Sequence, residues 1–492
     1  MVEEKMKARY IDERKLLFGK KKDAFEPRVG LLKYGPFGPS ENEEIIEFKK
    51  INCGIIGIAG DILKLRDYFK KVSLGLDAED STFGNLGFPG LHQKSPLRFS
   101  IRFLDSYIIK IKEFEVIDVI EIEDFNERKN KLIDLFDKKH AILYNIDPPP
   151  EVIFVLIPEA IITAFRRPEF QSTDIKFASR NDPDSVQKSQ GDIDFHSIMK
   201  ISGMQYNIPN QVIKPEFFIG KREDGSPLED PVTMAWNLSV AIYYKAKKIP
   251  WKFSKLDENT CYAGISFFRD FSKRDVYLNT AMAQIFLDTG ESFILRGESF
   301  ENKEKVKYKA PNLGYNVAKD ITEKIISQYK EVKGFLPNRV VIHKSSNFND
   351  EEIRGILQNS FSVKIFDLIT IMSYSDIRVF RKAQFPVMRG TLISTDEPYN
   401  RYFLFTHGFL PSLGTYPGMR VPIPIEIRKF TQNSDIDQIC SEILILTRLD
   451  WNNIKYCQRM PVTLAFAEKV GNILAERRAI NVTIPIHYRF YM

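Results

Sequence analysis

The sequence has few cysteines, and their positions exclude two kinds of stabilising chemistry. Among its 492 residues there are four, Cys53, Cys261, Cys440 and Cys457, with no CxxC pair and no histidine at metal-ligand spacing. Neither a disulfide framework nor a zinc site is therefore indicated. Because secreted proteins commonly carry disulfides, a reducing, cytoplasmic location is expected.

Long apolar runs, repeats and one common nucleotide motif are also missing. The longest apolar stretch, residues 152–165, contains Pro158 and Glu159 and is too short to cross a bilayer. The first residues, MVEEKMKARYIDERK, lack the apolar core of a signal peptide, so no secretion is implied. No membrane partner is expected. The absence of a repeat argues against a solenoid, and without GxGxxG a dinucleotide site is not supported.

Composition predicts a globular protein with a mild excess of positive charge. The length allows about two to four domains, and the 43% hydrophobic content is enough for substantial cores. The 71 basic and 65 acidic side chains give a formal charge of +6. This excess would favour a polyanion if it were gathered into a groove, although charge alone does not establish nucleic-acid binding.

The first half alternates between strand and helix patterns. Gly35-Pro36 and Gly38-Pro39 mark turns after an expected short strand, and Asp61 is the expected cap of a helix over 61–72. Strands are expected at 53–59, 97–103 and 152–157, with a second helix over 124–136. This alternation predicts an α/β fold with a Rossmann-like domain.

The second half opens with three expected strands and continues with helices. The strands cover 261–268, 275–286 and 292–297. The later elements are expected to be helices at 315–332, 349–358, 435–449 and 461–478, and strands at 339–343, 361–372 and 390–405. Three successive strands followed by this mixture predict an RNase H-like layout.

The stretch 195–211, FHSIMKISGMQYNIPNQ, is the first candidate site. On a helix, Phe195, Ile198 and Met199 form an apolar stripe, while His196 and Lys200 share the neighbouring face. The His196 imidazole can become positively charged, and the Lys200 ammonium is positively charged already. Together at one end of a helix, the two groups suit a terminal phosphate. The alternative is an ordinary solvated helix face.

Two more residues can join this site. Gln211 follows a breaker, residues 207–210, and adds an amide. Lys245 shares a helix face with Asn237 and Ala241, at spacings of four residues, so it should point where Asn237 points. The polar segment 171–191, which precedes the site, is expected to be a mobile loop.

Several separated blocks resemble prokaryotic short Argonautes. They are LLFG with EPRVGLLKYGP, FVLIPE, the set of His196, Lys200, Gln211 and Lys245, YYKAKKIPW, LTRLDWNN and PVTLAFAEKVGNIL. Short Argonautes consist of a MID and a PIWI domain. The resemblance implies an N-terminal segment and Rossmann-like MID domain over 1–225, followed by an RNase H-like PIWI domain over 226–492.

The resemblance also implies roles for particular residues. His196, Lys200, Gln211 and Lys245 match the residues that hold the 5′-phosphate of a guide strand. The His196 ring is also expected to stack on the first base, since base–ring stacking contributes about 1–3 kcal/mol. The Met492 carboxylate and Gln211 would be ligands of a Mg²⁺ ion beside that phosphate, since hard oxygen ligands suit a hard ion. The alternative for the chain's last residues is a strand that merely closes a sheet.

The sequence departs from the family where cleaving PIWI domains carry metal-binding acids. Two-metal nucleases need a carboxylate cluster. The matching positions here hold Ser266 and, after the strand RVVIH, Lys344 and Ser345. The nearby Asp270, Asp275 and Glu298 are expected to be solvated hairpin charges. Because the metal-binding carboxylates are missing, the chain is not expected to be an enzyme. Candidate contacts to a guide–target duplex are Arg269, Lys273, Arg274, Lys344 and Arg389.

The resemblance implies an RNA-guided sensor of invading DNA in prokaryotic immunity. Its partners would be a 5′-phosphorylated guide RNA, a complementary target DNA, and an APAZ-domain protein carrying a TIR, sirtuin-like or nuclease effector. Two alternatives stay open. One is an active Argonaute nuclease with an altered metal cluster, and the other is a protein scaffold that has lost nucleic-acid binding.

Overall fold

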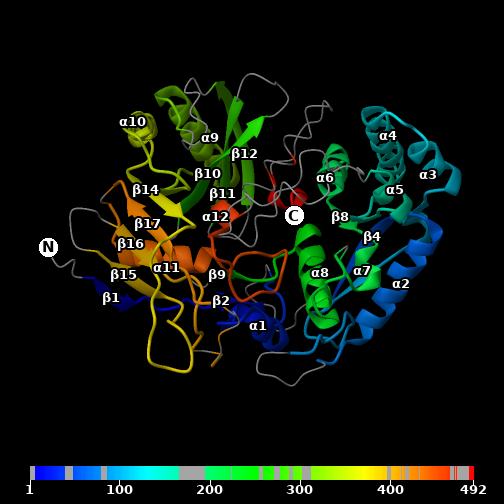
Figure 1. Ribbon diagram of the computed structural model, residues 1–492, viewed down its shortest axis with the longest axis horizontal. Helices are drawn as coiled ribbons and strands as arrows, with labels where there is room; N and C mark the ends of the chain where they lie inside the picture. The colour runs from blue at the N-terminus through cyan, green and yellow to red at the C-terminus, as the bar shows by residue number, and fades with distance from the viewer. Residues whose placement is uncertain are drawn as a thin grey trace.

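Two large β-sheets, each with its own helices, lie beside one another in the computed structural model (Figure 1). The structure describes residues 6–38, 48–78, 86–165, 194–222, 224–253, 259–270, 278–287, 292–301, 312–395, 401–411, 413–414, 416, 420–431, 433–465, 470, 473 and 487–492. Within these ranges, no helix combines the length and the apolar character that crossing a bilayer requires.

The first sheet is parallel and confirms the Rossmann-like prediction. Its order is β5-β4-β7-β8, and β6 also pairs with β4. The strands are β4 (Lys49–Gly57), β5 (Phe99–Arg102), β6 (Ile108–Lys110), β7 (Val152–Leu156) and β8 (Asn210–Ile213). Every residue of β7 is buried, as expected for a parallel strand covered on both faces.

Helices that connect and flank these strands complete this half. They are α2 (Ala59–Leu74), α3 (Glu113–Ile120), α4 (Phe125–Tyr144), α5 (Glu159–Ala164), α6 (Phe195–Gln205), α7 (Glu216–Ile219) and α8 (Pro231–Lys245). Asp124 caps α4, because its carboxylate accepts from the Glu127 amide at 2.8 Å. The cap predicted for α2 is wrong, since Asp61 lies inside its first turn and Ile58 precedes it.

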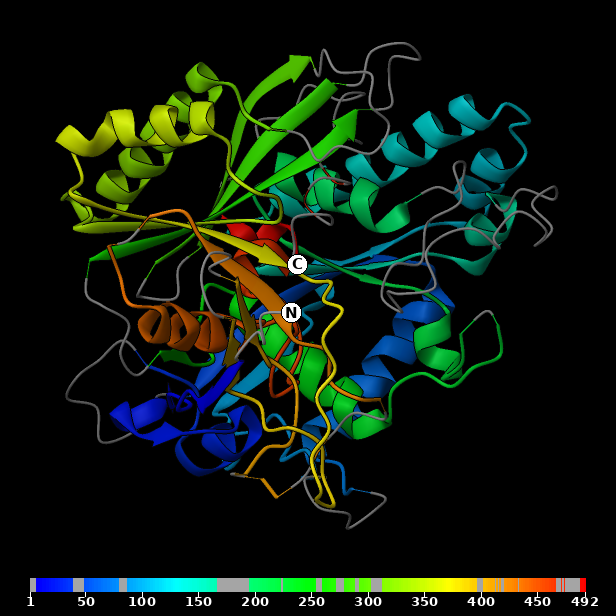
Figure 2. The same cartoon turned by 60° about the vertical axis from the view of Figure 1, so that its left-hand side comes forward.

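The second sheet has nine strands in the described part of the chain, and its centre confirms the RNase H-like layout. Strands β10 (Thr260–Asp270), β11 (Leu278–Leu287) and β12 (Ser292–Glu301) are antiparallel neighbours. Strands β13 (Arg339–Lys344) and β14 (Ile365–Met372) continue the sheet parallel to β10. Helices α9 (Tyr315–Lys333) and α10 (Asp350–Leu357) pack together beside these strands, as Figure 2 shows.

The remaining strands extend this sheet to the first residues of the chain. Beyond β14 the order is β17-β16-β15-β1, with all pairings antiparallel. Their bounds are β1 (Lys7–Tyr10), β15 (Thr391–Ser394), β16 (Arg401–Leu404) and β17 (Ile425–Lys429). The expected strand at 390–405 is therefore a pair of antiparallel strands.

Residues 6–38 are fixed to the second half by charge as well as by strand pairing. The Glu13 carboxylate accepts from Arg448 Nη1 at 2.9 Å and also pairs with the Arg389 guanidinium, and both arginines are buried. Strands β2 (Leu16–Leu17), β3 (Asp23–Ala24) and β9 (Lys252–Phe253) form a small sheet. The strand expected before Gly35 is instead helix α1 (Pro27–Tyr34), which begins with proline and a Glu26 cap.

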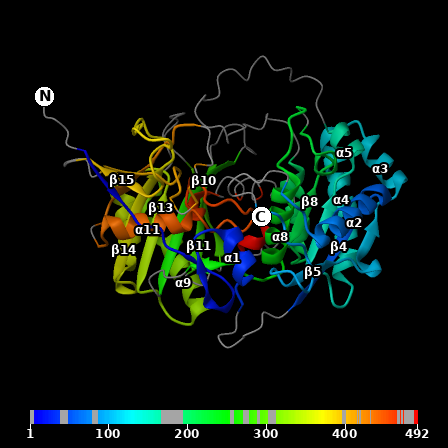
Figure 3. The same cartoon turned by 90° about the horizontal axis from the view of Figure 1, so that it is seen from below.

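The two halves share hydrophobic packing. One buried cluster contains Phe154 of β7, Trp236 of α8 and Ile427 of β17. Helices α11 (Ile436–Leu446) and α12 (Val462–Ala465) belong to the second half, and the short helix η6 (Tyr488–Phe490) lies at the end of the chain. In Figure 3 the last residue lies between the two halves, near α8. The boundary at 225/226 stays a prediction.

Candidate functional site

Helix α6 presents a buried lysine, which a solvated helix face would not. Phe195, Ile198 and Met199 pack in the cluster that covers the parallel sheet, as their spacing predicts. His196 is half-buried, and Lys200, one turn later, is only 1% exposed. Burying an ammonium group is costly unless it is hydrogen-bonded, so Lys200 needs specific partners.

The turn after α6 brings β8 back against the helix. Asn207 adopts a positive φ of 54°, and Gly203 lies so close to the returning chain that a Cβ there would approach the Ile208 carbonyl oxygen to 2.7 Å. A side chain at Gly203 would thus force the two segments apart. The Asn-Ile-Pro-Asn breaker therefore positions Gln211 next to α6 as the sequence predicts.

Three of the four predicted phosphate ligands meet at β8. Lys200 Nζ donates to the backbone carbonyl of Asn210, and Lys245 Nζ donates to Gln211 Oε1 at 2.5 Å. Lys245 lies at the last turn of α8 and is 1% exposed. The fourth residue, His196, lies on α6 one turn before Lys200. The structure thus places Lys200, Gln211 and Lys245 around a single strand end.

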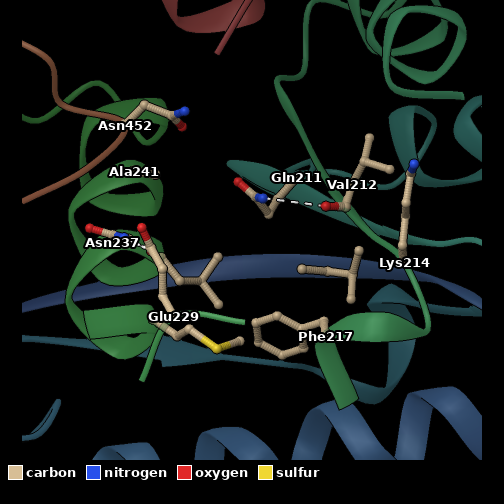
Figure 4. Close-up of a pocket in the computed structure, with 11 residues that line it drawn as sticks. Gln211, Val212, Lys214, Phe217, Glu229, Asn237, Ala241 and Asn452 are labelled. Carbon is tan, nitrogen blue, oxygen red and sulfur yellow. Dashed lines mark hydrogen bonds between the residues drawn. The ribbon is translucent and has the colours of Figure 1, made fainter. Parts of the chain in front are cut away.

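A cavity of about 270 Å³ opens beside Gln211 (Figure 4). Its polar lining includes Lys214, Glu229, Asn237 and Asn452, while Phe217, Met234 and Leu238 supply apolar surface. Asn237 and Ala241 of α8 line the cavity together with Gln211, and Lys245, on the same face of α8, donates to Gln211. This face of α8 therefore points toward Gln211, as the spacing predicts.

The side chain of Asn237 ties this cavity to the second half of the chain. Asn237 donates to Glu229 at 2.7 Å and accepts from the Ile454 amide at 2.8 Å. Asn452 faces the same space from the loop after α11. The cavity is therefore formed by both halves of the molecule.

The end of the chain lies against the helices that carry the site. Helix η6 packs on α6, α8 and β12, and Met492 is 5% exposed. The Arg489 guanidinium lies over the Tyr244 ring of α8, 5.6 Å from its centroid. Met492 is thus buried just after a helix that packs on α6 and α8, which carry Lys200 and Lys245.

The predicted degenerate positions lie at the end of the pairing between two neighbouring strands of the second sheet. Ile265 of β10 pairs with Lys344, the last residue of β13; Ser266 is the next residue of β10, and Ser345 is the first residue after β13. Ser266 is 7% exposed, whereas Ser345 is exposed. Neither hydroxyl carries the negative charge with which a carboxylate holds a metal ion.

Lys344 serves the packing of this sheet. Its ammonium contacts Glu352 Oε1 at 2.5 Å and the Asn347 carbonyl at 3.2 Å, and both charged side chains are fully buried. Burial lowers the pKa of Lys344, while the Glu352 carboxylate opposes that shift. The neighbouring His343 bonds Thr463 at 2.8 Å, and burial lowers its pKa to about 3.

Two predicted duplex contacts are wrong. Lys344 is fully buried, and Arg389 is 1% exposed with bonds to Glu13, the Thr406 and Leu444 carbonyls and Thr447. Neither can reach a bound strand. The Arg269, Asp270 and Glu298 side chains and all of Lys273, Arg274, Asp275 and 171–191 lie outside the described part of the chain. Among the residues that are described, no cluster of three or more histidine, cysteine or acidic side chains could hold a metal.

Sequence reasoning missed the polar residues beneath β8. His140 of α4 is fully buried, and its ring bonds both the Phe136 carbonyl and the Asn210 side chain. Asn210 stands immediately before Gln211 but was interpreted only as part of a breaker. Because His140 lies 70 residues away in sequence, spacing gave no signal of this contact.

No protein-family model and no curated protein matches the sequence. Among solved structures, Clostridium butyricum Argonaute bound to a guide DNA and a 19-mer target DNA aligns with a TM-score of 0.60 and 14% identity, over 96% of this chain and 53% of that one. The crystal structure of A. aeolicus Argonaute aligns with a TM-score of 0.56 and 15% identity, over 98% of this chain and 56% of that one.

A third similar structure is Marinitoga piezophila Argonaute in complex with a 5′-hydroxyl guide RNA and target DNA. Its TM-score is 0.56 at 15% identity, over 94% of this chain and 57% of that one. The chain thus spans a little over half the length of each of these three proteins. At such identities the likeness concerns the fold, and the chain has the α/β fold of the MID and PIWI domains of Argonaute proteins.

Proposed function

We propose that the chain binds the 5′ end of a guide RNA and uses it to recognise a complementary target DNA. The observation that carries this proposal is the meeting of Lys200, Gln211 and Lys245 at β8, beside a cavity formed by both halves. Two buried ammonium groups and an amide suit a phosphate monoester. The similar structures of Argonautes with guide and target strands support the assignment of the ligand class.

The proposed ligand is a 5′-phosphorylated guide. Hydrogen bonds to charged groups contribute about 1.5–3 kcal/mol each, so three or four of them distinguish a phosphate from a hydroxyl. One of the similar Argonautes was solved with a 5′-hydroxyl guide RNA, so the competing proposal is a site that prefers the hydroxyl. The buried lysines favour the phosphate, because a neutral hydroxyl gains less from them.

We propose a Mg²⁺ ion beside the phosphate, held by Gln211 and the Met492 carboxylate. The donor set fits, because an amide oxygen has two lone pairs and Gln211 Oε1 uses one for Lys245. Met492 is buried, and helix η6 just before it packs on α6 and α8. When bound, the ion would offset negative charge between guide phosphates, and hard oxygen ligands suit it.

We propose further that target binding is not followed by cleavage. Ser266 and Ser345 cannot replace ionised metal ligands, and Lys344 with Glu352 forms an internal ion pair. The signal would pass to an APAZ-domain protein with a TIR, sirtuin-like or nuclease effector, in prokaryotic immunity. The sequence resemblance supports that partner. The alternative nuclease would need a metal cluster of another composition.

Two assays test these proposals. Purified protein should carry short 5′-phosphorylated RNA and should copurify with an APAZ-domain protein when expressed with its neighbouring genes. Guide-loaded protein should retain a labelled complementary DNA intact in Mg²⁺ or Mn²⁺. Discrete metal-dependent products would support the nuclease alternative, and absence of any bound nucleic acid would support the scaffold.

A further inference from the structure

We infer that the buried pair His140 and Asn210 positions the phosphate-binding residues, an inference that rests on the proposed function. Successive side chains on a strand point to opposite faces. Asn210 therefore points beneath β8 while Gln211 points into the site. Fixing the side chain of Asn210 fixes both the direction of Gln211 and the carbonyl that accepts from Lys200.

The hydrogen-bond geometry determines which atoms donate. His140 Nδ1 lies 2.7 Å from the Phe136 carbonyl oxygen, so this nitrogen carries the proton and donates. His140 Nε2 is then an acceptor, and Asn210 Nδ2 donates to it at 2.9 Å. The second Nδ2 proton goes to the Met199 carbonyl at 2.5 Å. One amide nitrogen thus joins α4, α6 and β8.

Burial makes this arrangement specific. His140 is fully buried and Asn210 is 1% exposed, so water cannot replace a lost partner at either group without entering the core. Burial also lowers the pKa of His140, which keeps the ring neutral and Nε2 able to accept. A carboxylate at position 210 has no proton to donate. Its oxygens would face two other acceptors, His140 Nε2 and the Met199 carbonyl.

Gly203 completes the arrangement from α6. A Cβ at this position would lie 2.7 Å from Asn210 Cγ and 2.8 Å from Asn210 Nδ2. Only glycine therefore allows the helix to approach the amide closely enough for the Met199 bond. Gly203→Ala and Asn210→Asp are two independent ways to displace the same contact.

The test uses the ratio of dissociation constants for two guides that differ only in a 5′-hydroxyl or 5′-phosphate. Asn210→Asp keeps the size of the side chain and removes its donors, and Gly203→Ala separates α6 from it. Both should lower the wild-type preference for phosphate at least tenfold, with little change in hydroxyl-guide affinity. Leu132→Ala, which removes buried packing from α4, is the matched control and should leave the ratio within twofold while lowering the melting temperature.

The outcomes separate this inference from the proposed function. A wild-type protein with no preference overturns the proposed phosphate site, and the inference with it. A wild-type protein that prefers phosphate, together with a folded Asn210→Asp variant whose ratio is unchanged, overturns the inference alone. If circular dichroism shows that Asn210→Asp does not fold, an unchanged ratio in Gly203→Ala overturns it.

Discussion

Lysines are buried in both halves of the molecule, and the closest acceptors described for them differ in charge. Lys344, in the second half, contacts the carboxylate of Glu352. Lys200 and Lys245, in the first half, donate to the neutral oxygens of Asn210 and Gln211. A carboxylate neutralises an ammonium group, whereas an amide or carbonyl oxygen orients it. A buried lysine alone therefore does not identify an anion site, because its ammonium group can be neutralised by an internal carboxylate, as that of Lys344 is.

The strongest destabilisation is expected in the second half of the molecule. Glu352→Gln leaves the Lys344 ammonium buried without its carboxylate, and breaking a buried ion pair in this way costs about 3–5 kcal/mol. Denaturant unfolding should show this loss of stability. Glu351→Gln, which changes the exposed neighbouring acid, is the control and should stay within about 0.5 kcal/mol of wild type.

The next effect is on the preference for a 5′-phosphorylated guide over a 5′-hydroxyl guide. Lys200→Ala combined with Gln211→Ala removes two partners of the proposed phosphate, so the preference for a phosphorylated guide should fall by about 100-fold or more, equivalent to at least about 2.7 kcal/mol. Lys330→Ala with Gln93→Ala changes the same residue types at exposed positions and should preserve the preference. An unaltered preference in the first pair would place the phosphate site elsewhere.

A smaller effect is expected on the pH dependence of the unfolding free energy. The pKa of His343 falls to about 3 in the folded chain, below the usual 6.5, so the unfolded chain binds the proton first. Its contribution to stability is complete above pH 6.5 and decreases as the pH falls toward 3, by at most about 1.4 kcal/mol per pH unit. His343→Gln should flatten the dependence of unfolding free energy on pH between 6.5 and 5. An unchanged slope would show that other groups carry it.

The smallest effect is expected at Ser345. This residue is exposed, and its hydroxyl has no metal-binding role in the proposed function. Ser345→Ala should therefore change neither stability, by more than about 0.5 kcal/mol, nor target-DNA affinity, by more than about twofold. Loss of a metal-dependent cleavage activity in this variant would contradict the proposal of a non-cleaving protein.

Much of the fold could be predicted because local patterns agree with the tertiary structure. The apolar run that became β7 and the three strands β10, β11 and β12 were located to within a few residues. The error at α1 arose because LLKYGP reads as a strand before a turn, whereas Pro27 and the Glu26 cap start a helix. The set of His196, Lys200, Gln211 and Lys245 could be proposed because it resembles a pattern in short Argonautes, and the structure brings Lys200, Gln211 and Lys245 together.

The supporting contacts could not be predicted in the same way. The bond between His140 and Asn210 joins residues 70 positions apart, and no periodicity connects them. Likewise, Lys344 and Arg389 were interpreted as duplex contacts because a basic side chain gives no sign of its burial. Their partners, Glu352 and Glu13, are known only once the strands and helices are packed.

The most direct test of the central claim is the affinity of the wild-type protein for two guide RNAs of identical sequence, one with a 5′-phosphate and one with a 5′-hydroxyl. Equilibrium binding at fixed salt and Mg²⁺ should give at least about 100-fold tighter binding of the phosphorylated guide, since each charged hydrogen bond contributes about 1.5–3 kcal/mol. Equal affinities, or tighter binding of the hydroxyl guide, would contradict a phosphate site formed by His196, Lys200, Gln211 and Lys245.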